Sequence, residues 1–182
     1  NYFGKFMLKR TNYCGQLRES DLGSTVTIAG WVQSYRDHGS LVFVDLRDRE
    51  GLVQVVFDPE TNAEAHKAAR LLRCEWVIGI VGTVRKRAEG MENNKIPTGE
   101  IEIIANSLEI LNESKTPPFE VDSAENVGEE VCLAQRYIDL RRPKMQDKLR
   151  IRHTVAKIVR DHFDEDGFSE IETPFLGKST PE

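Results

Sequence analysis

The chain has 182 residues, of which 39% are hydrophobic and 30% charged, and its formal net charge is −5. This composition is typical of a folded protein with a hydrophobic core, and the length suffices for one domain and part of another. No apolar run approaches the roughly 20 residues that a transmembrane helix needs, which argues against a helical membrane protein.

The three cysteines, Cys14, Cys74 and Cys132, are far apart in the sequence. Their number and spacing fit neither a disulfide framework nor a zinc site, and the four histidines also lack metal-ligand spacing. We therefore expect free thiols in a reducing cytosol, a cytoplasmic protein and no metal site. Residues 1–9 lack the apolar core and cleavage site of a signal peptide, so we expect an N-terminal extension there.

Three β-rich runs separated by turn residues lie between Thr25 and Phe57. Apolar residues alternate within each run, which predicts strands with one buried face. The inward residues expected from this alternation are Val26, Ile28 and Val32 in the first strand, Val42, Val44 and Leu46 in the second, and Val53, Val55 and Phe57 in the third.

The opposite face of these strands carries chemistry suited to single-stranded nucleic acid. A period of two places Phe43, Asp45 and Arg47 together on the second strand and Gln54 on the third. A ring can stack on a base, an amide can read a base edge, and a cation can meet phosphate. The alternative is that Phe43 packs under a loop and Gln54 is solvent-facing polar surface.

The next segments complete a small barrel. Thr61 or Asn62 can cap a helix that runs to about Arg73, and strand patterns follow at residues 76–84 and 100–104. In the last strand Ile101 and Ile103 face inward, so Glu102 faces outward. Five strands with a helix between the third and fourth predict an OB-fold, a barrel that commonly binds oligonucleotides.

The chain changes character after the barrel. Residues 112–131 contain two adjacent prolines, several acids and little periodicity, and are predicted to be a linker. A helix is predicted for residues 144–166, ended by Gly167, and a strand for residues 168–173. This helix and strand cannot bury their own apolar surface, so we expect them to belong to a larger domain or to meet a partner.

Four long motifs in this order resemble those of bacterial-type aspartyl-tRNA synthetases. They read GWVQSYRDHGSLVFVDLRDREGLVQVVFDP from residue 30, PTGEIEI from residue 97, RYIDLRRPKMQDKLRIRH from residue 136, and GFSEIETPFLGKSTPE from residue 167. The resemblance implies an OB-fold anticodon-binding domain over residues 10–111, a hinge over 112–131, and the start of a class II α+β catalytic domain over 132–182. The expected fold is thus a five-stranded OB barrel with one helix, followed by the first helix and strand of that catalytic domain.

The resemblance assigns anticodon contacts to residues on the outward face. It implies that Phe43 stacks on a base, that Arg36 and Gln54 read the central uracil, and that Glu102 lies near the third base. Arg85 and Arg87 flank the strand ends in the sequence and are candidates for contacts to the tRNA backbone.

Two positions near the first turn carry further expectations. The family often has a basic triplet where this chain has Ser34, Tyr35 and Arg36, which leaves open whether Tyr35 stacks on a base. His38 is either a plain turn residue or a base contact. In the family a leucine there tends to accompany enzymes restricted to tRNA(Asp), and a histidine those that also charge tRNA(Asn).

The C-terminal part resembles class II motif 1, with Pro174 as its characteristic proline. In the family this helix and strand form a homodimer interface. Glu182 matches a loop residue that faces the ammonium group of the substrate aspartate, the alternative being a solvated loop acid. The family reaction uses ATP and Mg²⁺ to form aspartyl-adenylate and then charges tRNA. Motifs 2 and 3 are not among these 182 residues, so we expect no catalytic residues here and no activity from the chain alone.

Two other interpretations remain open. The chain could come from another class II synthetase, for asparagine or lysine. It could also be a non-catalytic OB module that binds tRNA and dimerises through its helix.

Overall fold

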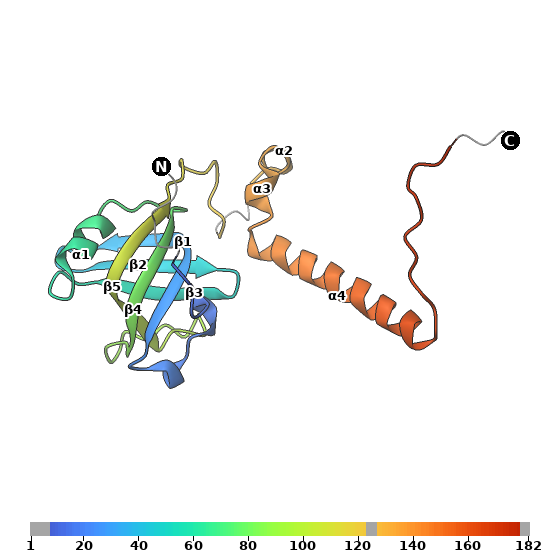
Figure 1. The fold of residues 1–182 in the computed structure, drawn as a ribbon. Coiled ribbons are helices and arrows are strands. Elements are labelled where there is room, and N and C mark those ends of the chain that lie inside the picture. Colours follow the sequence, from blue (N-terminus) through green and yellow to red (C-terminus); the bar gives the residue numbers. More distant parts are fainter. Residues whose placement is uncertain (1–7, 123–126, 179–182) are drawn as a thin grey trace. The chain divides into compact units, whose positions relative to one another are not determined.

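The computed structural model describes residues 8–122 and 127–178. These form two compact units, divided between Pro117 and Pro118. The first unit is a closed barrel with one helix beside it, and the second is helical (Figure 1).

The barrel consists of five strands in the order β1-β2-β3-β5-β4. Their bounds are β1 Thr25–Asp37, β2 Val42–Asp48, β3 Gly51–Phe57, β4 Val77–Lys86 and β5 Ile101–Asn112. All neighbouring strands are antiparallel except β3 and β5, which pair in parallel through only two residue pairs, Val55 with Ile103 and Val56 with Ile104. The predicted OB-fold is confirmed, and β5 is much longer than the predicted five residues.

The residues predicted to face inward are all buried, and β2 alternates as predicted. In β3, however, the outward Gln54 and Val56 are buried as well. The inward valines, isoleucines and leucines of all five strands form one hydrophobic core cluster with Phe57. Strong bending is possible at Gly82 of β4, where an added Cβ would lie 2.5 Å from the carbonyl oxygen of Ile104. Any side chain at this position would force the two strands apart.

A bulge in β1 changes which residues face outward. Val32 pairs with Leu46, but the next pair joins Ser34 to Asp45, so Gln33 is the extra residue. After this shift Ser34 and Arg36 face outward and Tyr35 packs against the core cluster. Tyr35 thus does not lie on the outward face beside Arg36, which argues against the possibility that it stacks on a base there.

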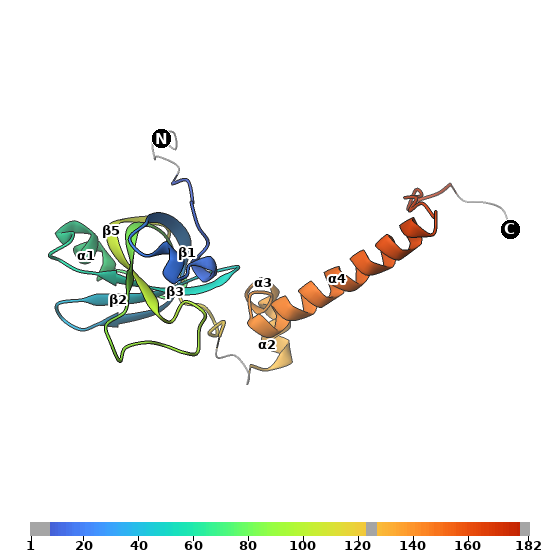
Figure 2. The ribbon, with the colours of Figure 1, turned by 90° about the horizontal axis from the view of Figure 1, so that it is seen from below.

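Short segments close the barrel. Helix α1 (Ala63–Ala69) begins at Asn62, whose side chain accepts a hydrogen bond from the Ala65 amide at 2.9 Å, as expected for a helix cap. The helix packs against β3 and β5 (Figures 1 and 2). Two 3₁₀ turns, Cys14–Gln16 and Glu19–Asp21, precede β1.

The second unit contains the helices α2 (Glu129–Ala134), α3 (Arg136–Asp139) and α4 (Pro143–Glu165). Helix α4 starts with a proline and is followed by Gly167 with a φ of +82°, close to the predicted bounds. The two shorter helices were not predicted. Residues 168–173 form no strand, contrary to prediction, because the described part of the chain places no neighbouring strand beside them. Among the described residues, no helix is long and apolar enough to cross a bilayer.

Candidate anticodon-binding face

Each of the five strands contributes one polar side chain to a row on the outer face of the barrel. In the order of the strands around the sheet these side chains are Arg36, Asp45, Gln54, Glu102 and Arg85. Cross-strand register brings them together, since Asp45 pairs with Gln54 across β2 and β3, and Arg85 pairs with Glu102 across β4 and β5. We call these five residues the polar row.

The polar row is connected by hydrogen bonds from end to end. Arg36 Nη2 donates to Asp45 Oδ1 at 3.1 Å and to Gln54 Oε1 at 3.3 Å. Gln54 Nε2 donates to Glu102 Oε2 at 2.7 Å, and Arg85 Nε donates to Glu102 Oε1 at 2.8 Å. Donors and acceptors alternate along the row, so each side chain fixes the orientation of its neighbour.

The middle of the polar row is buried. Gln54 is 8% exposed and Glu102 is 6% exposed, whereas the side chains of Arg36 and Arg85 at the two ends are each 48% exposed. The interpretation of Gln54 as plain solvent-facing surface is therefore wrong. A buried amide with both polar atoms bonded is rigid, which suits the reading of a base edge better than general solvation does.

Phe43 lies on the same face as the polar row. It pairs with Arg36 across β1 and β2, and its ring is partly exposed. His38 meets this ring edge to face, with centroids 5.4 Å apart and an interplanar angle of 87°. Phe43 is outside the core cluster. The ring is thus available as a stacking platform at one end of the face.

The turn that carries His38 is held by backbone bonds. The His38 amide donates to the Leu41 carbonyl at 2.9 Å, and the Gly39 amide donates to Asp37 Oδ1 at 2.8 Å. The latter bond is the main cause of a lowered pKa for the Asp37 carboxyl. Asp37 also accepts from Arg70 Nε at 3.2 Å, which ties the turn to the end of α1. His38 therefore sits in an ordered turn beside Phe43.

The two candidates for backbone contacts differ in accessibility. Arg85 is half exposed and bonded to Glu102. Arg87 is only 7% exposed, its Nε donates to the Ile101 carbonyl at 2.9 Å, and its Nη2 has no hydrogen-bond partner among the described residues. Burial lowers the pKa of Arg87, an effect that Glu102 and Asp45 oppose through their charge. A phosphate contact is therefore easier to reconcile with Arg85 than with Arg87.

Arg47, which the alternation also placed on this face, is engaged elsewhere. Its Nη2 donates to both carboxylate oxygens of Glu75, at 2.8 and 2.9 Å, and the two side chains are 15% and 9% exposed. Glu75 has a φ of +65°, and its amide donates to the Val32 carbonyl at 2.7 Å, next to the bulge of β1. This pair is a structural support of the face and was not recognised in the sequence.

The remaining site predictions lie in the C-terminal unit. Glu182 is outside the described residues. Pro174 is described and exposed, in a segment without regular secondary structure. In the part of the chain that the structure covers, no group of three or more His, Cys, Asp or Glu side chains could hold a metal ion.

Comparison with known protein families agrees with this architecture. Residues 26–111 match the family described as "OB-fold nucleic acid binding domain", and residues 128–182 match "tRNA synthetases class II (D, K and N)". The chain belongs to the class II tRNA synthetases of the D, K and N group. The motifs' resemblance to aspartyl-tRNA synthetases is confirmed by relatives that are named as aspartate--tRNA ligases.

Relatives of this class II synthetase chain cover nearly all of it. It is 56% identical over 175 residues to "Aspartate--tRNA(Asp/Asn) ligase" of Halothermothrix orenii, which is 96% of this chain and 30% of the relative. It is 52% identical to "Aspartate--tRNA ligase" of Listeria monocytogenes over 97% of this chain and 30% of the relative. The chain thus spans about a third of the length of these relatives.

A solved structure shows the same fold. The asparaginyl-tRNA synthetase from Pyrococcus horikoshii, determined with asparaginyl-adenylate, has a TM-score of 0.79 and 26% identity over 93% of this synthetase chain and 37% of that one.

Proposed function

We propose that this synthetase chain is the anticodon-binding portion of an aspartate--tRNA ligase, together with the beginning of its catalytic domain. The observation that carries the proposal is the polar row beside Phe43, because it places a stacking ring next to rigid donors and acceptors on one open face. The two high-identity relatives named above support aspartate as the amino acid. The partner is tRNA(Asp).

Each group on the face has a distinct part in this binding. Phe43 stacks on one base, which leaves the neighbouring base edges turned toward the sheet. Arg36 keeps Nε and Nη1 for RNA, because its hydrogen bonds within the described residues all leave from Nη2. Gln54 and Arg36 read the central uracil, and Glu102 accepts from the third base. Arg85 holds Glu102 and offers positive charge to the backbone.

The chemical reaction belongs to the whole protein. With Mg²⁺, aspartate displaces pyrophosphate from ATP to form aspartyl-adenylate, and the aspartyl group then passes to the tRNA with release of AMP, in the cytoplasm. Among the described residues no cluster of His, Cys, Asp or Glu side chains could hold the magnesium ion. Glu182 is proposed to face the substrate ammonium group, on the basis of the STPE motif alone.

The test of the proposed face is Gln54→Ala. This change should reduce discrimination between uracil and cytosine at the central anticodon base by about 1–3 kcal/mol, the value of one good bidentate contact. The measurement is the Kd of the chain for anticodon stem-loops that differ only at that base. Equal weakening for all bases at that position would show that Gln54 supplies general affinity only.

His38 is proposed to extend the specificity to tRNA(Asn). The two tRNAs differ at the third anticodon base, C against U, and a glutamate can accept from the cytosine amino group but gains nothing from a uracil carbonyl. The His38 imidazole has an N–H that can donate to such a carbonyl and bring the two affinities together. Relatives named for both tRNA(Asp) and tRNA(Asn) support this proposal.

We expect the full-length enzyme to charge both tRNAs, and His38→Leu to lower charging of tRNA(Asn) selectively. The measurement is kcat/KM with each tRNA. A wild-type enzyme that already rejects tRNA(Asn) a hundredfold, about 2.7 kcal/mol, would reduce His38 to a turn residue.

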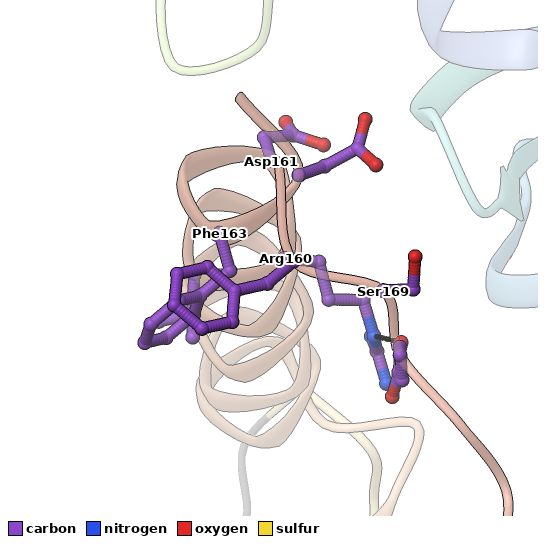
Figure 3. Close-up of a pocket in the computed structure, with 8 residues that line it drawn as sticks. Arg160, Asp161, Phe163 and Ser169 are labelled. Carbon is purple, nitrogen blue, oxygen red and sulfur yellow. Dashed lines mark hydrogen bonds and ion pairs between the residues drawn. The ribbon is translucent and has the colours of Figure 1, made fainter. Parts of the chain in front are cut away.

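Self-association through α4 is a further expectation. Six large apolar side chains of this helix are each 43% exposed or more, namely Leu149, Ile151, Val155, Ile158, Val159 and Phe163. At its end, the pocket in Figure 3 is lined by Phe163 and Phe168, whose rings meet edge to face at 5.6 Å. Such a surface suits a symmetric partner, and Pro174 is proposed to lie in the same interface.

Sedimentation at micromolar concentration should show a dimer, and Ile158→Asp should shift it to monomer. Lys144→Glu, an exposed change at the start of α4, is the matched control and should leave the dimer intact. If both this chain and the full-length enzyme sediment as monomers, the interface does not exist.

A further inference from the structure

Asp45 is an unexpected residue for a surface that binds RNA. It lies in the centre of β2 between Ser34 and Gln54, and its side chain is 27% exposed. A carboxylate on such a face repels phosphate and lowers general affinity for RNA. Asp45 must therefore contribute to RNA binding in some way other than by adding affinity.

The contacts of Asp45 lie within the protein. Its Oδ2 accepts a hydrogen bond from Ser34 Oγ at 2.5 Å, and both of its oxygens accept from Arg36 Nη2, at 3.1 and 3.2 Å. The Ser34 hydroxyl reaches Asp45 only because the bulge in β1 brings Ser34, rather than Gln33, opposite it. The carboxylate is thus itself held from one side while it holds the guanidinium on the other.

The position of Arg36 in turn fixes Gln54. The same Nη2 that contacts Asp45 also donates to Gln54 Oε1 at 3.3 Å, while Gln54 Nε2 donates to Glu102. A reversed amide would set N–H groups against the guanidinium and an oxygen against the carboxylate, so only one orientation satisfies both neighbours. Without Asp45, the half-exposed Arg36 side chain is free to turn toward phosphate, and Gln54 loses one of the two groups that orient it.

We propose that Asp45, held by Ser34, is a positioning residue that sets specificity at the central anticodon base by orienting Arg36 and, through it, the Gln54 amide. The proposal rests on the proposed function of this face. In this arrangement Asp45 increases selectivity for the central base and lowers the overall affinity for RNA. Removal of its charge should let the wrong RNA bind more tightly, which the loss of a merely structural group would not do.

The experiment measures the Kd of the full chain for two anticodon stem-loops, with uracil or cytosine at the central position. It compares wild type, Asp45→Asn, Asp45→Ala and Ser34→Ala. For Asp45→Ala we expect the ratio of the two Kd values to fall at least fivefold, with the cytosine stem-loop bound as well as or better than by wild type. Asp45→Asn and Ser34→Ala, which keep part of the contact, should give smaller losses of the same kind.

Glu64→Gln is the matched control for charge. Glu64 is an exposed acid on α1, outside the polar row, and its loss should leave the ratio unchanged. Circular dichroism and thermal unfolding establish that each variant is folded. If Asp45→Ala does not fold, Ser34→Ala provides the test in its place.

The outcomes separate the two proposals. If wild type binds both stem-loops equally, the proposed function of the face fails. If wild type discriminates and the folded Asp45 variants discriminate equally well, the face is correct but Asp45 does not position Arg36. An equal loss of affinity for both stem-loops would also overturn the positioning proposal, since it would mark Asp45 as a general support of the fold.

Discussion

Phe43→Ala should weaken binding of an anticodon stem-loop by about 1–3 kcal/mol, the usual value of a base stacked on an aromatic side chain. The ring is partly exposed and outside the core cluster. The His38 ring meets it edge to face, with the two ring centroids 5.4 Å apart. Fluorescence anisotropy with a labelled stem-loop measures the loss. Because a stacked base of any type contacts the ring, the loss should be nearly independent of sequence.

The neighbouring residue supplies a control of opposite character. Val42 is 0% exposed and part of the core cluster, so Val42→Ala should lower the free energy of unfolding by roughly 0.5–3 kcal/mol and leave the Kd of the folded protein unchanged. Phe43→Ala should raise the Kd and leave the free energy of unfolding nearly unchanged. If Phe43→Ala unfolds the barrel instead, the assignment of the two faces of β2 is inverted.

Glu75→Ala should have the largest effect on stability. It would leave the Arg47 guanidinium, 15% exposed, without the carboxylate that now accepts two of its hydrogen bonds. Breaking a buried ion pair by removing one partner costs about 3–5 kcal/mol. Urea unfolding followed by circular dichroism measures the difference.

Replacement of both partners tests the cause of this loss. Where an uncompensated charge is responsible, Arg47→Met combined with Glu75→Ala should recover most of the stability, since an apolar pair of similar volume is often as stable as a buried ion pair. A double variant that is no more stable than Glu75→Ala would show that an uncompensated charge on Arg47 is not the cause of the loss.

Local patterns in the sequence were sufficient for much of the barrel. The alternation of apolar residues in β2 and β3 identified Phe43 and Gln54 as outward. Capping side chains narrowed the start of α1 to Thr61 or Asn62, and the structure selects Asn62. These features depend on neighbours within a few residues, which is the range over which periodicity and capping act.

The position of Arg36 could not have been obtained in this way. Counting by twos from Val32 places Arg36 on the inner face, and only the bulge at Gln33 brings it outward. The resemblance to aspartyl-tRNA synthetases assigned Arg36 to the outward face without this count, because it matched the residue to an anticodon contact. The burial of Arg87 and the Arg47–Glu75 pair were not predictable either, because both depend on contacts between segments far apart in the chain.

The C-terminal unit shows a different limit. Residues 168–173 have the alternation of a strand, but a strand exists only through hydrogen bonds to another, and the described residues provide none there. The amphipathic pattern of α4 was recognisable because a helix satisfies its backbone within itself.

The parallel seam between β3 and β5 gives the barrel an additional property. Only two residue pairs join these strands, and the Gln54–Glu102 hydrogen bond crosses the same line between residues 48 positions apart. RNA bound to both Gln54 and Glu102 would hold β3 and β5 together at the shortest strand pairing of the barrel. Local opening there would expose backbone amides to hydrogen exchange in the free protein and would be suppressed when RNA is bound. A stem-loop at 100 times its Kd would stabilise the closed barrel by about 2.7 kcal/mol, so occupancy by tRNA also contributes to the stability of the fold.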